Sequence, residues 1–452
     1  MGIPRPLRIA IVASGVFTCV AFVVAAISSG ATPRKQATRH VHPRPPAAKP
    51  ASTSVVKTAP AASTGITADQ LVALARIKHV IFVTKENRSF DNYFGLYPGA
   101  DGTSTGRTMA GRTRRLARLL DTNKDLRHDR AAMLHDIHFG QMTGFSSMPH
   151  PNFAYTEARP GQLPAYWAYA RHYTLGDHMF SSVAAPSLPN HIFTVAAHDG
   201  GMVDDRGYSG QWGCDAPASQ RVPVYRDGRR SLQYPCFNIT SLGQQLSRRL
   251  ISWRAYGPRL HAQGSGWIGY EAIRGVRKTA LWSHIHPNPQ LWKDLARNRL
   301  PAVSWVVPPY ERSEHPPASV CSGEDWTTSL VDRVMRSPYW SSTLIVVTYD
   351  ESGGFYDHLA PPRVDNLGYG PRVPLLLIGP WVKPGFIDHH TYDFASIDKL
   401  IALRYHLPML SRREANATPI TAALQAQTPT PALILPQQPC PKPPKLGAAP
   451  AD

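Results

Sequence analysis

Short, almost wholly apolar segments recur along the middle of the chain. Four of them have the length of a strand: Ile77–Val83, Ala302–Val307, Thr343–Thr348 and Val373–Ile378. Continuous apolar runs of this length are typical of strands that are buried on both faces of a parallel sheet. Segments with helical periodicity lie between them, at Pro289–Asn298 and Thr327–Met335. The alternation predicts an α/β fold with a layered, mostly parallel sheet.

The two ends of the chain have a different pattern. Arg5 and Arg8 precede an uncharged apolar run, Ile9–Ile27, so residues 1–31 are expected to be a secretion signal or, if uncleaved, a membrane anchor. Residues 32–65 are basic and rich in Pro and Ala, which predicts a linker. The globular body then covers residues 66–410, and residues 411–452 form a Pro-rich tail that we expect to be poorly ordered.

The composition fits a large, basic, exported protein. The 452 residues are 42% hydrophobic, which supports a sizeable core, and the net charge of +18 favours anionic partners such as lipids, nucleic acids or phosphorylated substrates. The arginine-rich stretch Arg107–Arg118 has no interleaved aromatic residues, so we interpret it as a solvated loop and expect no nucleic acid. Export would place the body in an oxidising compartment. Of the three possible pairings of the four later cysteines, we favour Cys214–Cys236 with Cys321–Cys440.

Polar side chains follow two of the predicted strands. Glu86 and Asn87 come just after the first, and Asp350 and Glu351 come just after the third. Sites in parallel sheets form at the carboxyl ends of strands, and carboxylate and amide oxygens suit a hard divalent cation. Taken singly, Glu86 or Asp350 is better explained as an ordinary turn or cap residue. Because both pairs occupy such an end, the pattern favours a metal site.

A candidate nucleophile lies between these two pairs. Ser187 precedes an apolar helical pattern, where backbone N–H groups and the helix dipole favour a phosphate. A plain helix-capping serine explains this stretch taken alone. His128, His315 and His358 stand in polar contexts and could contact a phosphoryl group or protonate a leaving oxygen, although structural roles are the commoner use of histidine.

An ordered set of short blocks resembles the bacterial phosphoesterase family, which contains phospholipases C of the non-haemolytic type and related acid phosphatases. The blocks cover almost the whole body, and their agreement in order is far more specific than any one of them. They are Lys85–Gly95, Gly140–Phe145, Pro186–Asn190, His315–Val320, Tyr349–His358 and Gly370–Pro374. Two positions depart from the family pattern: Thr143 stands where Asp is usual, and His191 stands where Arg is frequent.

The resemblance implies an alkaline phosphatase-like α/β fold, with a central mostly parallel sheet between helices on both faces, over a phosphoesterase catalytic domain at 66–410. It implies one divalent metal ion of open identity. Carried over by residue, the ion would be held by Glu86, Asn87, Asp350, Glu351 and the nucleophile Ser187. The same resemblance assigns His128 and His315 to the phosphoryl group or the leaving oxygen, with His358 as a supporting residue.

The expected function is hydrolysis of phosphate esters through a phosphoserine intermediate, by an exported enzyme in the periplasm, cell envelope or medium. The motifs do not separate an acid phosphatase from a phospholipase C acting on choline lipids. Trp212, Tyr225 and Tyr234 could line a head-group pocket, although packing beside Cys214–Cys236 is their simpler role. Association with a membrane surface would accompany the lipid substrate. The non-catalytic alternative is a basic cell-surface protein that binds anionic polymers.

Overall fold

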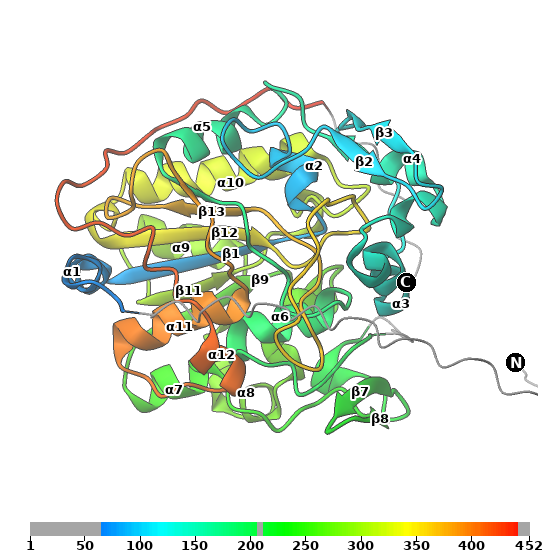
Figure 1. Cartoon of the computed structure of the whole chain (residues 1–452). Coiled ribbons are helices and arrows are strands. Elements are labelled where there is room, and N and C mark those ends of the chain that lie inside the picture. Colours follow the sequence, from blue (N-terminus) through cyan, green and yellow to red (C-terminus); the bar gives the residue numbers. More distant parts are fainter. Residues whose placement is uncertain (1–64, 206–210, 442–452) are drawn as a thin grey trace, which may run out of the picture. The chain divides into compact units, whose positions relative to one another are not determined.

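An eight-stranded sheet forms the centre of the computed structural model, which describes residues 65–205 and 211–441. The strand order is β10-β9-β11-β1-β12-β13-β6-β14 (Figure 1). Neighbouring strands are parallel throughout except at β13, which is antiparallel to both β12 and β6. The predicted α/β fold with a mostly parallel sheet is therefore confirmed.

The remaining strands form three two-stranded ribbons, β2–β3, β4–β5 and β7–β8. The strands of the central sheet are β1 (His79–Lys85), β6 (Thr174–Gly176), β9 (Trp253–Gly257), β10 (Ile285–Pro287), β11 (Val303–Val306), β12 (Thr343–Tyr349), β13 (Leu375–Ile378) and β14 (Phe386–Asp388). Those of the ribbons are β2 (Thr105–Arg107), β3 (Thr113–Arg115), β4 (Ala117–Arg118), β5 (Thr156–Glu157), β7 (Val222–Arg226) and β8 (Arg229–Gln233). The stretch expected to be a solvated loop, Arg107–Arg118, thus contains a hairpin: Arg107 pairs with Thr113 across β2 and β3.

Helices cover both faces of the sheet, as predicted. In Figure 1, α5 and α10 lie on one side of the strands, and α6, α7 and α11 lie on the other. The helices are α1 (Ala68–Arg76), α2 (Phe90–Phe94), α3 (Arg130–Ile137), α4 (Pro151–Ala154), α5 (Pro164–His172), α6 (Ser187–Ala196), α7 (Leu242–Arg248), α8 (Arg274–Arg277), α9 (Pro289–Ala296), α10 (Val320–Met335), α11 (Phe394–Tyr405) and α12 (Arg412–Asn416). The central strands β11, β12 and β13 are buried along their whole length, because both faces are covered. This burial explains their continuous apolar sequences.

Helix α10 begins seven residues earlier than the periodic pattern predicted. The Ser319 hydroxyl accepts a hydrogen bond from the backbone N–H of Ser322 at 3.1 Å and caps the helix. The first turn contains Ser322, Gly323 and Glu324, which carry no apolar signal although all three are buried. The additional turns bring the start of α10 close to the segment that carries His315.

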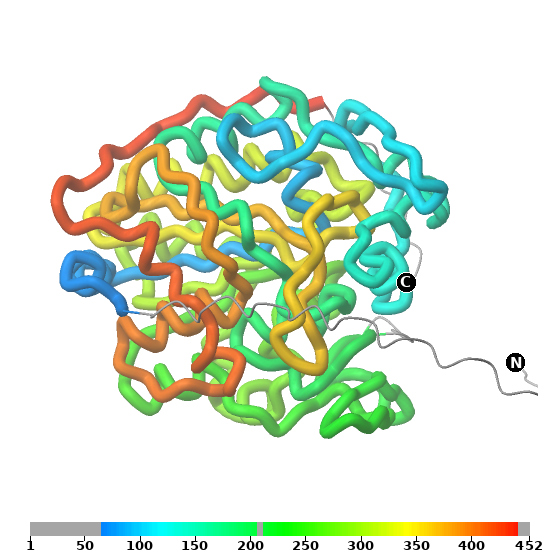
Figure 2. The backbone as a smooth tube through the Cα atoms, viewed as in Figure 1, coloured from blue at the N-terminus to red at the C-terminus, as the bar shows by residue number. Residues whose placement is uncertain are grey.

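Residues 411–441 correct the prediction of a poorly ordered tail. They contain α12, and Ile420 and Leu424 are buried in the main core. Further on, the backbone N–H groups of Leu435 and Gln438 donate to Asp332 and Asp325 on α10. Figure 2 shows this red segment following the outside of the helical layer. The body therefore extends to the end of the described chain at residue 441.

Both predicted disulfides are present, Cys214–Cys236 and Cys321–Cys440. The second one ties residue 440 to the first turn of α10. The expected signal or anchor at 1–31 and the linker at 32–65 lie outside the described residues, apart from Gly65. Within 65–205 and 211–441, no helix is both long and apolar enough to cross a bilayer.

Candidate active site

The two polar pairs predicted from the sequence meet at one edge of the sheet. Strands β1 and β12 are parallel neighbours, and Lys85 pairs with Tyr349 at their ends. Glu86 and Asp350 are the residues that directly follow this pair, so they lie side by side beyond the carboxyl ends of the two strands. The backbone N–H of Asn87 donates to Asp350 Oδ1 at 2.9 Å, which fixes the two strand ends to each other.

Backbone conformation at this edge is specialised. Asn87 has a φ of 61°, in the left-handed region that asparagine tolerates better than most residues. Gly353 also lies in this region, with a φ of 62°, and a Cβ there would come within 2.7 Å of the Asn87 Cβ. The backbone N–H of Gly353 donates to Glu351 Oε2. The glycine after the acidic pair is thus required for the close approach of the two loops.

Four of the five predicted metal ligands each have one buried side-chain oxygen that accepts no hydrogen bond from a described residue. These atoms are Glu86 Oε2, Asn87 Oδ1, Asp350 Oδ2 and Glu351 Oε1. All four side chains are fully buried. Unsatisfied buried oxygens are costly, and carboxylates buried together are costlier still unless a cation compensates them. The donor set therefore fits a hard divalent cation.

The pKa values of two of these carboxyl groups are strongly displaced. Burial raises the pKa of Glu86 well above its usual range, and the neighbouring charge of Asp350 raises it further. Burial also raises the pKa of Glu351 well above its usual range, although the positive charge of His128 opposes the change. The protein alone provides too little positive charge for this cluster, which again fits a bound cation.

His191 belongs to the same cluster and was missed as a site residue. Its Nε2 lies 2.8 Å from Glu86 Oε1 and 3.8 Å from Asp350 Oδ2, so the three side chains could hold one metal ion. Burial lowers the pKa of His191 to about 4, which leaves the ring neutral and able to ligate a cation. The sequence showed His191 only as a departure from the family pattern.

Ser187 is the first residue of α6, one turn before His191. Side chains four residues apart lie on the same face of a helix, so Ser187 shares the face that His191 directs toward Glu86. Pro186 occupies the capping position, and no capping side-chain hydrogen bond forms at this end of α6. The interpretation of Ser187 as a plain capping serine is therefore wrong. The residue is almost fully buried, beside the free N–H groups of the first helical turn.

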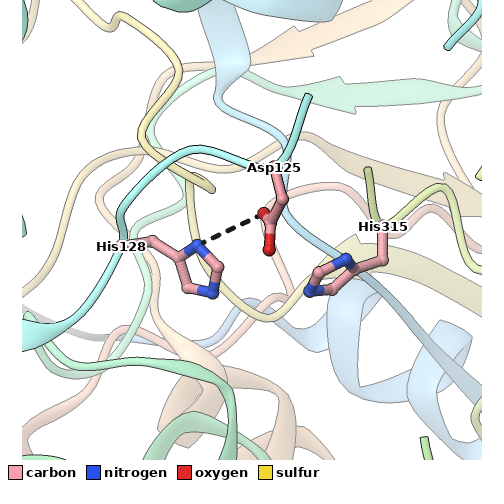
Figure 3. A group of neighbouring side chains, drawn as sticks. All are labelled: Asp125, His128 and His315. Carbon is pink, nitrogen blue, oxygen red and sulfur yellow. Dashed lines mark ion pairs between the residues drawn. The ribbon is translucent and has the colours of Figure 1, made fainter. Parts of the chain in front are cut away.

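A second group of polar side chains contains Asp125, His128 and His315 (Figure 3). In both histidines Nδ1 faces a backbone carbonyl: Leu126 O at 2.6 Å for His128, and Pro316 O at 2.7 Å for His315. Because a carbonyl only accepts, Nδ1 carries the proton and Nε2 is directed elsewhere. Asp125 lies 3.6 Å from His128 Nδ1 and would stabilise the charged ring.

Two residues connect this group to the carboxylate cluster. The side-chain nitrogen of Asn87 lies 3.5 Å from His128 Nε2. The indole of Trp267 stacks on His315 at 5.5 Å between ring centroids and on His191 at 6.5 Å. The structure thus gathers the predicted residues Glu86, Asn87, His128, His315, Asp350 and Glu351 around one place, with Asp125 and His191 added. Asp125 lies in the same short motif as His128, and that proximity was the available signal.

His358 lies in a different group, which corrects its expected supporting role. Its Nδ1 lies 2.7 Å from Asp91 Oδ2 and its Nε2 lies 3.2 Å from Asp101 Oδ1. Arg372 joins the same group through Asp91 and Asp357. Burial lowers the pKa of His358, but the hydrogen bond to Asp91 and the negative charges of Asp91 and Asp357 together outweigh that effect, so the net change is upward. We therefore assign His358 to an ion-pair network that anchors the loop after Glu351.

Tyr234, one of the three aromatic residues considered for a head-group pocket, has a structural role. The hydroxyl of Tyr234 donates to the carbonyl oxygens of Ala216 and Cys214, at 2.7 and 3.2 Å. Tyr234 thus braces the loop closed by Cys214–Cys236, as the simpler interpretation expected. The aromatic surface beside the candidate site comes instead from Trp267 and Tyr310, which stack at 5.7 Å.

Several known proteins are similar to this chain. The non-hemolytic phospholipase C of Pseudomonas aeruginosa is 26% identical over 79% of this chain and 58% of the relative, so the chain spans little more than half of its length. Phospholipase C A of Mycobacterium tuberculosis is 25% identical over 79% of this chain and 78% of the relative. A crystal structure of an alkaline phosphatase superfamily protein from Vibrio parahaemolyticus has 10% identity and a TM-score of 0.37, with 77% of each chain covered.

The model of the phosphoesterase family matches residues 77–408. This interval begins just before β1 and ends after α11, so it contains the central sheet and every candidate site residue described above. The match extends over well more than half of the chain. On that evidence the protein is a member of the phosphoesterase family.

Proposed function

We propose that this chain is an exported, metal-dependent hydrolase of phosphate esters, of the phospholipase C type. The observation that carries the proposal is a set of four buried oxygens that accept no hydrogen bond from a described residue, on Glu86, Asn87, Asp350 and Glu351. His191 on helix α6 contacts Glu86, one of these four residues, and Ser187 is the first residue of the same helix. The names of the relatives favour phospholipids over phosphomonoesters as substrates.

The chemistry we infer has two steps. Ser187 Oγ, ionised after its proton has passed to solvent, attacks phosphorus, and the bond from phosphorus to the leaving alcohol breaks, so that a phosphoserine forms. The N–H groups at the start of α6 stabilise charge on the phosphoryl oxygens. His315 donates a proton from Nε2 to the leaving alcohol. Water then attacks the phosphoserine and gives up a proton to the same imidazole, which restores Ser187 and releases the phosphate product.

Glu86, Asn87, Asp350 and Glu351 would hold the divalent cation, with Ser187 as a further ligand. When bound, a cation at this place lowers the pKa of the serine hydroxyl and offsets charge on the phosphoryl group. The ring of His128 lies beside Asn87, and in its protonated form it would add positive charge beside the same oxygens. Export is supported by the apolar N-terminal sequence and by the two disulfides, which persist in oxidising compartments.

The test compares one lipid and one soluble substrate. Purified protein is assayed on phosphatidylcholine and on p-nitrophenyl phosphate, each with and without a chelator. We expect hydrolysis of the lipid, its loss with chelator, and a fall of about a thousandfold or more in Ser187→Ala. Ser187→Thr keeps a hydroxyl at the same position and should retain measurable turnover.

The outcomes separate the alternatives. Turnover of the monoester alone would replace the phospholipase proposal with an acid phosphatase. Turnover of neither substrate would favour the non-catalytic alternative, a basic protein that binds anionic polymers. Near-normal turnover in Ser187→Ala would remove Ser187 as the nucleophile.

A further inference from the structure

Three large apolar side chains are exposed on the segments next to the candidate site. Phe139, just after α3, is 93% exposed, and Leu134 on α3 and Met109 in the β2–β3 hairpin are 48% and 45% exposed. A fully exposed phenylalanine gains nothing from its surroundings in water. Phe139 also has a φ of 56°, in the left-handed region that is unfavourable for residues with a β-carbon. Neither feature helps the fold, but Leu250 shares both, so the role of Phe139 has to be inferred from its surroundings.

Hydrogen bonds join these segments into one local unit. The Ser147 hydroxyl lies 2.6 Å from His135 Nε2 on α3 and 3.0 Å from the sulfur of Met109. Ser146 accepts from the backbone N–H of Met109 at 3.0 Å. We call this unit the β2–α3 surface; it comprises residues 105–115 and 130–147. Its three exposed apolar groups are therefore held on connected elements.

The β2–α3 surface is strongly basic. Residues 105–115 contain four arginines and no acidic residue, and residues 130–147 contain Arg130 and a single acidic residue, Asp136, which is buried. Arg107, Arg112 and Arg115 are exposed and form no ion pair with a described carboxylate. Arg114 is held against the ring of Tyr155 at 4.6 Å. Exposed apolar groups flanked by arginines match the chemistry of an anionic bilayer surface.

This surface is attached directly to the candidate site. Helix α3 starts two residues after His128, and Asp129 caps it by accepting from Ala132 N–H at 3.0 Å. On the hairpin side, the backbone N–H of Arg107 donates to the hydroxyl of Tyr356, in the loop that follows Glu351. Figure 1 places β2, β3 and α3 on the side toward which β1 points. A bilayer held here would lie at the same edge of the sheet as the candidate site.

We propose that the β2–α3 surface docks onto an anionic phospholipid bilayer, with the Phe139 ring inserted at the boundary between head groups and acyl chains. The inference deepens the proposed function and rests on it, because docking delivers a lipid head group to Ser187. The arginines attract the anionic lipids, and the apolar side chains add affinity once the surfaces meet.

A matched control is available at Leu250. It is 94% exposed with a φ of 57°, nearly the same as Phe139. It lies just before β9 and therefore at the amino-terminal edge of the sheet, opposite the candidate site. Phe139→Ser and Leu250→Ser remove comparable apolar groups from exposed, left-handed positions at opposite edges of the sheet.

The experiment measures co-sedimentation with vesicles of phosphatidylcholine, alone or mixed with phosphatidylglycerol, in the Ser187→Ala background so that the lipid is not consumed. We expect binding to the mixed vesicles, about tenfold weaker in Phe139→Ser and unchanged in Leu250→Ser. Arg112→Ala and Arg115→Ala should each weaken binding about fivefold, and added salt should do the same. In the protein that retains Ser187, Phe139→Ser should slow the hydrolysis of lipid in vesicles but leave turnover of soluble p-nitrophenyl phosphorylcholine unchanged.

Several results would overturn the proposal. Equal losses in Phe139→Ser and Leu250→Ser, or no loss in Phe139→Ser, would show that this surface does not contact lipid. If the arginine variants weakened binding to vesicles and to soluble heparin alike while Phe139→Ser changed neither, the surface would bind polyanions instead. Failure of the proposed function has a different signature: docking that depends on Phe139, with no hydrolysis of any phosphate ester in the protein that retains Ser187.

Discussion

Lys85 and Glu314 form an ion pair that is completely shielded from solvent, with 2.9 Å between Nζ and Oε1. The ammonium also donates to the carbonyl oxygens of Arg312 and Gly323. The Glu314 carboxylate accepts hydrogen bonds from the hydroxyl groups of Tyr93, Tyr166 and Tyr349, at 2.6 to 2.7 Å. Lys85 precedes Glu86 and Glu314 precedes His315, so this buried pair connects the two halves of the candidate site.

Removing the charge of Glu314 should destabilise the protein and displace His315. Glu314 has a φ of 76°, a backbone conformation that is strained for a non-glycine residue and that its packed surroundings must maintain. We expect Glu314→Gln to lower the free energy of unfolding by about 3 kcal/mol, because Lys85 is left buried without its counter-ion. Denaturant unfolding measures this change, and kcat should fall while KM changes little.

The double variant Lys85→Met, Glu314→Gln provides the control for that pair. If the charges act as a pair, the double variant will be more stable than the sum of the two single variants implies. Additive losses would contradict the pairing. Recovery of stability without recovery of kcat would show that Glu314 also positions His315.

His315 and His128 should respond differently to the leaving group. In the proposed chemistry His315 protonates the leaving alcohol, whereas His128 Nε2 faces Asn87. A nitrophenolate leaves without a proton, but a diacylglycerol does not. We therefore expect His315→Ala to reduce turnover of phosphatidylcholine about a hundredfold more than turnover of p-nitrophenyl phosphorylcholine, which has the same head group.

His128→Ala provides the comparison within the same assay. If His128 stabilises the phosphoryl oxygens, its loss will slow both substrates by similar factors. A larger effect of His128→Ala than of His315→Ala on the lipid would reverse the two assignments.

The sequence predicted the centre of the fold better than its margins. Strands β1, β11, β12 and β13 lie under helices on both faces, so their apolar runs were visible without any tertiary information. Strands such as β9 and β14 are short or carry polar side chains such as Arg254, and the pattern did not distinguish them from loops. The tail at 411–441 looked disordered because its prolines and alanines gave no periodic signal, although backbone hydrogen bonds and Cys440 hold it in place.

The candidate site divides in the same way. Glu86, Asn87, Asp350 and Glu351 could be predicted because each pair directly follows a recognisable strand. His191 and Asp125 lie on a helix face and in a loop, where their neighbours are set by tertiary packing alone. His358 was placed by its motif, but its real partners Asp91 and Arg372 hold it elsewhere. The contact between Lys85 and Glu314 joins residues 229 positions apart, which no local pattern reveals.

Breaking the Cys321–Cys440 disulfide should loosen the segment that follows α12. The bond closes a loop of 119 residues, so its loss increases the entropy of the unfolded chain considerably. We expect Cys440→Ser to lower the free energy of unfolding by about 4–5 kcal/mol and to increase hydrogen exchange along residues 430–441. The double variant Cys214→Ser, Cys236→Ser is the comparison. Its loop spans only 22 residues, so equal losses from the two bonds would contradict the loop-length argument.

Stability should fall as the pH rises, because buried carboxyl groups retain their protons in the folded protein. Burial raises the pKa of Glu271 from 4.5 to about 8; the charge of Asp215 adds to the increase, and Arg277 opposes it. A pKa that is higher in the folded state gives stability that is fully present below the unfolded value and is lost as the pH rises through the folded one. The stability that Glu271 contributes should therefore be lost progressively between about pH 4.5 and about pH 8.

Thermal unfolding of Glu271→Gln across that range tests the assignment. The amide has nearly the same shape and never ionises, so the melting temperature of the variant should decline less steeply with pH than that of the parent protein. Glu311→Gln changes the net charge equally at an exposed position and should leave the slope unchanged. If both variants retained the parent slope, the carboxyl group of Glu271 would already be ionised in the folded protein, and the pH dependence would have to come from other buried acids such as Asp199, whose pKa burial raises to about 7.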